Sequence, residues 1–245
     1  MEHLEAIKKT IAQVASTYGD HFTVKADGKE TLDLLEPTPL ISMLAGELIY
    51  QLRSTLDHLA FDLVKINKAE VTLPTKWERD CMFPIWVGPL KPEQKTPLPY
   101  GTFKHLPGIP VEAHAIIERV QPYYPLGTGA INTSLGQLNS LSNIDKHRRF
   151  ALTVTRAQIR HDLIFKSGFT GYDIETLEHG AEISVPHAGE DDPIVGARRS
   201  TTLKIAFNEQ DALGNASGVP IDDLLEIILE EVSKEIVYPL RKFLN

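Results

Sequence analysis

Two short segments of this chain bring together residue types that can move protons or hold charge. Residues 53–58 read Arg-Ser-Thr-Leu-Asp-His, and residues 143–149 read Asn-Ile-Asp-Lys-His-Arg-Arg. Imidazole is the side chain best suited to exchanging protons near neutral pH, and charged groups beside it can hold or orient the reacting parts. The two segments are therefore the candidate site of the protein.

Four charged residues of these segments interrupt helix faces that are otherwise apolar. Arg53 and Asp57 share a stripe with apolar residues at spacings of three and four, as do Asp145 and Arg148. The apolar members are Ile49, Ala60 and Val64 on the first stripe and Leu138, Leu141 and Leu152 on the second. Arg53 and Asp57 are expected to be partly buried. Because removing one member of a buried ion pair costs roughly 3 to 5 kcal/mol, we predict an ionic lock in which Arg53 faces Asp145. Asp57 would face Arg148.

The two histidines lie on polar faces instead. His58 shares its stripe with charged, amide and hydroxyl side chains, and His147 lies with Ser140 and Asn143, away from the leucines. Both histidines are expected to be exposed or to line a groove. Such a placement suits a general acid or base, and it equally suits an ordinary surface residue.

The first segment resembles the Arg-x4-His motif of the HEPN superfamily, a group of helical domains that includes endoribonucleases of toxin and antiphage systems. In that family the motif lies on a long helix near a dimer interface, and its arginine and histidine act on the scissile phosphate and the ribose hydroxyl. The resemblance implies these roles for Arg53 and His58, with RNA as a partner and a homodimeric assembly. The chain departs from the family in its length, in its β-forming region and in Ser54, where Asn, Asp or Lys is usual.

The two motifs taken together, Leu-Arg-Ser-x-Leu-Asp-His and Asn-x-Asp-Lys-His-Arg, are similar to those of a group of uncharacterised bacterial proteins. That resemblance implies no function.

A metal-independent endoribonuclease is the first of three functions that fit the two segments. His58 or His147 would deprotonate a ribose 2′-OH, and cationic side chains would stabilise the charge that develops on the phosphate. This function needs no cofactor. The predicted catalytic residues are Arg53, His58, Asp145, Lys146 and His147, and the predicted binding or structural residues are Asp57, Asn143 and Arg148.

The other two functions use the same residues differently. In a non-enzymatic binding or assembly module, the charged residues would form the structural ionic lock. In a helical-bundle metal enzyme, carboxylates and imidazoles from two helices would bind the ion. The ligands of that site would be Asp57, His58, Asp145 and His147, although the chain has no Glu-x-x-His signature.

Composition bounds these functions. The chain has 245 residues, of which 42% are hydrophobic and 24% charged, as is ordinary for a globular protein. Its net charge of −8 argues against broad nonspecific binding to nucleic acid, although a localised basic site could still bind RNA. A single cysteine, Cys81, excludes an internal disulfide and fits a reducing cytoplasm. We see no export signal or membrane-spanning stretch.

Apolar periodicity and the positions of proline and glycine predict the elements that position the two segments. Helices are expected at residues 3–18, 40–67, 110–121, 134–149 and 221–243, a hairpin at 22–35, and an antiparallel sheet within 150–207. Pro239 is expected to kink or end the last helix early. The proline-rich residues 72–110 are expected to form an ordered loop anchored by Met82, Phe83, Ile85 and Trp86.

The predicted fold class is α+β, a helical-bundle core with an inserted antiparallel β-sheet. One domain is expected over residues 1–245, with its helical core at about 40–149 and 220–245 and its β-rich insertion at about 150–208. A symmetric homodimer is expected by analogy with HEPN proteins and because apolar residues of the last helix lie outside its main stripe.

Overall fold

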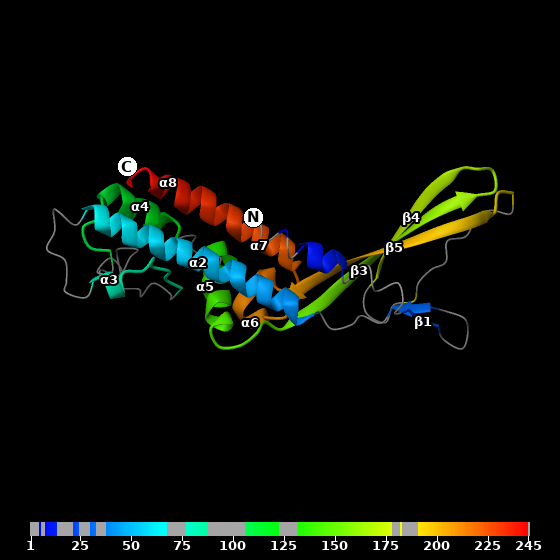
Figure 1. Ribbon diagram of the computed structural model, residues 1–245, viewed down its shortest axis with the longest axis horizontal. Coiled ribbons are helices and arrows are strands. Elements are labelled where there is room, and N and C mark those ends of the chain that lie inside the picture. Colours follow the sequence, from blue (N-terminus) through cyan, green and yellow to red (C-terminus); the bar gives the residue numbers. More distant parts are fainter. Residues whose placement is uncertain are drawn as a thin grey trace. The chain divides into compact units, whose positions relative to one another are not determined.

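The computed structural model of the protein describes residues 5, 8–13, 22–24, 30–32, 38–67, 77–87, 106–122, 132–177, 182 and 191–244 (Figure 1). The chain divides into two compact units. The β unit comprises residues 1–45, 151–208 and 218–222, and the helical unit comprises residues 46–150, 209–217 and 223–245. The predicted α+β fold class is confirmed, whereas the expectation of one domain stays a prediction.

The longest helix is α2 (Pro39–Asn67), whose residues 46–67 belong to the helical unit. Its apolar residues at three- and four-residue spacing are buried, as the periodicity predicts. Those with 0% exposure in the helical unit are Ile49, Leu56, Ala60, Leu63 and Val64. The polar stripe of the same helix is open to solvent, with Gln51, His58, Asp62 and Lys65 all exposed. This helix therefore has one buried face and one solvent-exposed face.

Two shorter helices pack into the helical unit. The first, α4 (Val111–Arg119), begins directly after Pro110 and ends before Pro122, as predicted. The second, α5 (Ser134–Asp145), is capped by the Thr133 side chain, which accepts a hydrogen bond from the Gly136 amide at 3.1 Å.

The prediction that α5 reaches residue 149 is wrong. The chain leaves the helix after Asp145 through a tight turn, in which the His147 amide donates to the Ile144 carbonyl at 2.9 Å. Short elements complete the helical unit: α3 (Trp77–Asp80), α6 (Gln210–Leu213) and the 3-10 turn η5 (Gly214–Ala216). The turn α3 was not predicted, because prolines surround it in the sequence.

The C-terminal helix changes its winding near Pro239. It begins as α7 (Ile221–Glu231), continues as the π-helical segment η6 (Val232–Val237) and closes with α8 (Tyr238–Arg241). Proline lacks the amide hydrogen of a regular turn and its ring crowds the preceding carbonyls. The helix meets this constraint with wider π turns before Pro239 and does not end there, so that the helical run extends to Arg241.

The β unit contains a three-stranded antiparallel sheet in the order β4-β3-β5. Its strands are β3 (Leu152–Phe165), β4 (Thr170–Leu177) and β5 (Ile194–Phe207), which confirms the predicted antiparallel sheet. On β3 the residues Ala157, Ile159, His161 and Leu163 are buried, while the residues between them are less covered or exposed. One side of the central strand β3 is thus covered and its other side faces solvent.

The hairpin and the helix predicted near the N-terminus are both present in the residues that the structure describes there. Strands β1 (Phe22–Val24) and β2 (Glu30–Leu32) pair in antiparallel register, which confirms the predicted hairpin, although its turn lies outside the described residues. Residues 8–13 are helical, and the rest of the predicted helix at 3–18 lies largely outside the described part. Within the described residues, no helix is both long and apolar enough to cross a bilayer.

Candidate functional site

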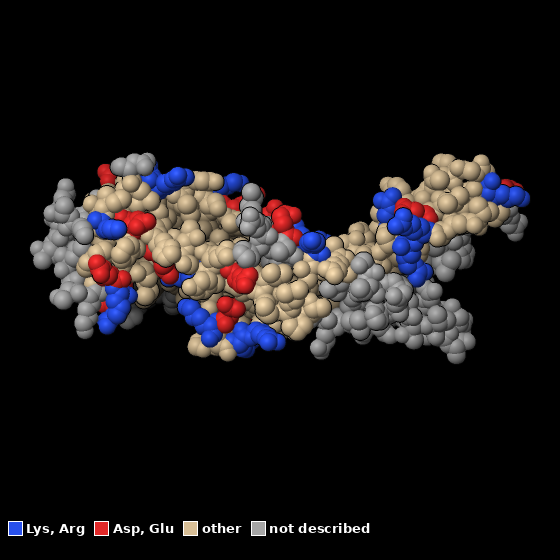
Figure 2. Space-filling model, in the orientation of Figure 1, with Lys and Arg blue, Asp and Glu red and all other residues tan. Residues whose placement is uncertain are grey.

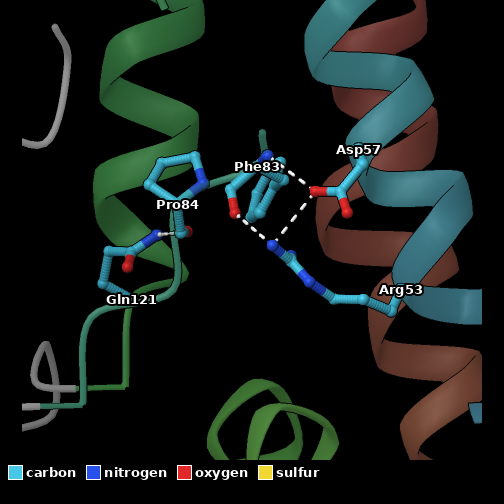
Figure 3. Close-up of polar contacts among 5 residues, drawn as sticks. All are labelled: Arg53, Asp57, Phe83, Pro84 and Gln121. Carbon is cyan, nitrogen blue, oxygen red and sulfur yellow. Dashed lines mark hydrogen bonds and ion pairs between the residues drawn. The ribbon is translucent and has the colours of Figure 1, made fainter. Parts of the chain in front are cut away.

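The side chains of Arg53 and Asp57 hold a distant backbone segment against α2. Arg53 Nη2 donates to the Phe83 carbonyl at 2.9 Å, and Asp57 Oδ1 accepts from the Phe83 amide at 2.9 Å. The two side chains also pair with each other, with 3.0 Å between Nη2 and Oδ1. Figure 3 shows both reaching from one helix to the backbone of Phe83. Asp57 and Arg53 thus satisfy both polar backbone groups of a residue whose side chain is fully buried.

Gln121 holds the same segment from the other side. Its side-chain nitrogen donates to the carbonyls of Pro84 and Ile117, both at 3.0 Å, and its side-chain oxygen accepts from the Trp86 amide at 2.8 Å. The residue is 1% exposed. We call Arg53, Asp57 and Gln121 the clamp, because together they bond the backbone of residues 83–86 (Figure 3).

The clamp is unsuited to binding a substrate. The Arg53 side chain is only 15% exposed; its Nη2 is bonded, and its Nη1 is buried without a hydrogen-bond partner in the described part of the chain. Burial lowers the pKa of Arg53 from its usual value, and the negative charge of Asp57 partly offsets this effect. A phosphate could reach this guanidinium only if residues 83–86 moved away.

Cys81 lies just before the clamped segment and is half-buried. Burial, together with the smaller effect of the nearby Asp57 carboxylate, raises the pKa of its thiol to about 11. The thiolate is the nucleophilic form of cysteine. A thiol with this pKa is protonated at neutral pH, so Cys81 is a poor nucleophile there.

The predicted ionic lock between the two motifs is wrong. Asp145 lies against α2 at Gly46, where an added Cβ would collide with the carboxylate and stand 3.1 Å from its Cγ. Gly46 and Arg53 are seven residues apart, about 10 Å along a helix axis, so this carboxylate lies two turns from the position on α2 that carries Arg53. Arg53 finds its carboxylate on its own helix, at Asp57, and Asp145 is exposed at the last residue of α5.

Arg148 also has a different partner from the one predicted. Its Nη1 and Nη2 donate to the two carboxylate oxygens of Glu209 at 2.8 and 2.6 Å, and Glu209 is buried. Hydrogen bonding and the negative charge of Glu209 raise the pKa of Arg148. This two-point contact joins the turn after α5 to the residue before α6. Arg148 is therefore paired with Glu209 and not with Asp57.

The remaining candidates do not gather around Arg53. His58 is exposed, and five residues of helix place it about 140° around the axis from Arg53. Asn143, Lys146 and His147 are exposed near the end of α5. The Arg-x4-His spacing therefore puts its two members on different faces of α2, one covered and one wet.

The metal alternative finds no support in the geometry. Asp57 is bonded to Phe83 and Arg53, while Asp145 lies beside Gly46. Among the residues that the structure describes, no three His, Cys, Asp or Glu side chains come together as a metal site.

A basic surface on the sheet was not among the predicted sites. Register places Arg156 opposite Lys204 and Asp162 opposite Arg198. Arg160 lies two residues before Asp162 on β3, so its side chain is on the same face. These residues lie on the wet face of the sheet, and Figure 2 shows Lys and Arg gathered over the strands. Tyr172 on β4 is 65% exposed, and the Arg160 guanidinium lies 4.6 Å from its ring centre. We call the four cations and Tyr172 the basic face.

The sequence does carry a signal for the basic face. Its cations occupy positions separated by even numbers of residues, 156 and 160 on one strand and 198 and 204 on another. Side chains alternate between the two faces of a strand, so even spacing predicts a shared face once the strands are known. By contrast, nothing in the sequence marks Phe83, Gln121 or Glu209 as partners of the motif residues.

Comparisons with protein-family models, with curated proteins and with solved structures found no match to this chain. The HEPN assignment, which residues 53–58 suggested, stays a prediction.

Proposed function

We propose that this protein is a non-enzymatic binding module that takes single-stranded RNA on the basic face of its sheet. The observation that supports the proposal is the placement of Arg156, Arg160, Arg198 and Lys204 on one wet sheet surface beside the exposed Tyr172. Nucleic-acid binding of this kind combines phosphate neutralisation by cations with stacking of bases on aromatic rings.

The charge of the basic face favours an anionic partner. The chain as a whole carries a net charge of −8, so cations on one surface are a local departure from its acidic character. Arg160 pairs with Asp162 at 2.7 Å and Lys204 approaches Asp222 at 3.9 Å. Among the described residues, Arg156 and Arg198 have no carboxylate within ion-pair distance, which leaves two guanidinium groups for phosphates.

The neutral side chains of the same face favour RNA over DNA. Gln158 faces Thr202 on β5 and Thr176 on β4, and Ser200 faces Arg160. Amide and hydroxyl groups both donate and accept hydrogen bonds, as does the ribose 2′-OH that DNA lacks. Tyr172 offers a flat ring for a base, which a double helix would keep stacked inside.

The placement of the motif residues supports a binding role over catalysis. Arg53 and Asp57 are bonded to the Phe83 backbone, and His58 lies on another face of α2. The ribonuclease activity implied by the HEPN resemblance stays a prediction, as do the homodimer and the cytoplasmic location.

Reversing two charges on the basic face is expected to weaken RNA binding about 10- to 100-fold at low salt. The variant Arg156→Glu/Arg198→Glu removes two phosphate contacts, so the slope of log affinity against log salt should fall by about 1.4 in magnitude. The measurement is fluorescence anisotropy of a labelled 20-nucleotide single-stranded RNA, repeated at several salt concentrations.

The matched control is Arg79→Glu/Arg241→Glu, which changes the net charge equally at two exposed arginines of the helical unit. It should bind the RNA within about threefold of the parent protein, since long-range charge alone is screened within about 10 Å at moderate salt. Equal losses in the two variants would refute the proposed surface. The RNA is expected to remain intact on a denaturing gel; cleavage that His58→Ala abolishes would instead favour the ribonuclease.

Removing the ring of Tyr172 is expected to weaken binding of the same RNA about 5- to 150-fold, because base stacking on an aromatic ring contributes roughly 1 to 3 kcal/mol. The test compares Tyr172→Ala with Tyr238→Ala, which removes the same side chain at the same 65% exposure in the helical unit. Tyr238→Ala should leave the affinity unchanged. Tight binding retained by Tyr172→Ala, or equal binding of single-stranded DNA of the same sequence, would argue against RNA stacking on this face.

A further inference from the structure

A pocket in the helical unit adjoins the clamp at Gln121, which is one of its lining residues. It has a volume of about 280 Å³ and is lined by the end of α4, the start of α5 and the π-helical turns of η6. All of its lining residues belong to the helical unit. π-Helical turns inside α-helices are frequent at functional sites, because the widened turn shifts side chains out of regular spacing.

The pocket has an apolar floor. Leu135, Val232 and Ile236 line it, and each of these residues is less than 5% exposed. Ser134 lies among them at 7% exposure, and the structure records no hydrogen bond for its hydroxyl among the described residues. Because no described residue bonds this hydroxyl, it can form a hydrogen bond with a group that enters the pocket.

The rim of the pocket is acidic. Glu231 and Glu235 both line it and are exposed, and Arg119 contacts Glu235 at 3.5 Å. Within the described part of the chain, Glu231 has no cation within ion-pair distance. Two carboxylates four residues apart on one helix repel each other, so the rim gains from a second positive charge.

We propose that this pocket binds an organic cation, a primary ammonium or guanidinium group on an aliphatic chain. The chain would lie on Leu135, Val232 and Ile236, the cation would sit between Glu231 and Glu235, and the Ser134 hydroxyl would accept a hydrogen bond from it. Free alkylamines and the side chains of lysine or arginine share this chemistry. The pocket volume fits a group of that size. This proposal is independent of RNA binding on the sheet.

The test uses n-hexylamine, with n-hexanol and hexanoate as the neutral and anionic ligands of equal length. Titration followed by amide NMR shifts of the full chain should give a Kd on the order of 1 mM for the amine, as expected for seven non-hydrogen atoms. The largest shifts should fall at Leu135, Gly136 and Val232. We expect the alcohol to bind at least fivefold more weakly and the carboxylate to show no saturable binding.

Variants on the rim and floor separate a cation site from a plain apolar cavity. Glu231→Gln should weaken hexylamine binding about fivefold and Ser134→Ala about threefold, while hexanol binding stays unchanged in Glu231→Gln. The matched control is Glu230→Gln, one residue earlier on α7, which pairs with Lys234 at 3.0 Å and does not line the pocket. Equal affinity for amine and alcohol, a Glu231→Gln variant that binds like the parent, or shifts centred elsewhere would overturn the proposal.

Discussion

Replacing Gln121 with leucine is expected to lower the free energy of unfolding by about 3 to 5 kcal/mol, the largest effect that we predict for a single residue. The side chain makes three hydrogen bonds at 1% exposure. Leucine has a volume similar to that of glutamine, so the substitution leaves little cavity. The loss of stability therefore comes from the missing hydrogen bonds. The Trp86 amide and the Pro84 carbonyl would be left without their partner, and each such buried group costs about 1 to 3 kcal/mol.

The effect of Gln121→Leu should be local to the clamped segment. Urea unfolding gives its size, and amide hydrogen exchange should show faster exchange at Trp86 than in the core of α2. The matched control is Gln137→Leu on α5. Gln137 is 6% exposed, and the described residues provide no hydrogen bond to its side chain. Its replacement should change stability by less than about 1 kcal/mol. A comparable loss in both variants would show that the bonds to residues 84 and 86 contribute little.

Replacing Asp57 with alanine is expected to cost about 3 kcal/mol, the second largest effect. The change removes the acceptor of the Phe83 amide and leaves the Arg53 guanidinium, at 15% exposure, without its counter-charge. Loss of one partner from a mostly buried pair is costly because the remaining charge has already lost its water. Asp57→Asn should cost less, since an amide oxygen can still accept from the Phe83 amide.

Asp62 provides the control for Asp57. It lies on the exposed side of the same helix, so Asp62→Ala should change the free energy of unfolding by no more than about 0.5 kcal/mol. Arg53→Lys should recover only part of the clamp, because an ammonium group cannot reproduce the planar guanidinium that contacts both Phe83 and Asp57. An Asp57→Ala variant as stable as the parent would show that the clamp does not hold residues 83–86 in place.

These two experiments also separate structure from catalysis. If Arg53 and Asp57 act through the clamp, their variants lose stability and protection of the Phe83 amide together. A catalytic arginine would instead lose activity with the fold intact. His58 is exposed and outside the clamp, so its replacement tests the ribonuclease prediction without disturbing residues 83–86.

The sequence by itself determined the main helices and strands and which of their faces are buried. Apolar spacing of three and four predicted the long helix at 40–67, and the structure has α2 at Pro39–Asn67. Alternation predicted the antiparallel sheet that β3, β4 and β5 form. The same local patterns predicted that Arg53 and Asp57 are partly buried and that His58 is exposed or lines a groove. In the structure Arg53 and Asp57 are partly buried and His58 is exposed. Periodicity reports which face of an element is covered, because it depends only on residues a few positions apart.

Only the tertiary structure decided which groups meet. Arg53 was expected to find Asp145, but the close packing at Gly46 places that carboxylate two turns away. The groups that Arg53 and Asp57 bind instead are the carbonyl and amide of Phe83, 30 and 26 residues distant. Every residue except proline carries both of these backbone groups, so no side-chain pattern could single out Phe83. Helix register and the path of the chain after Cys81 bring the Phe83 backbone next to Arg53 and Asp57. Both the register and the path depend on packing across the whole helical unit.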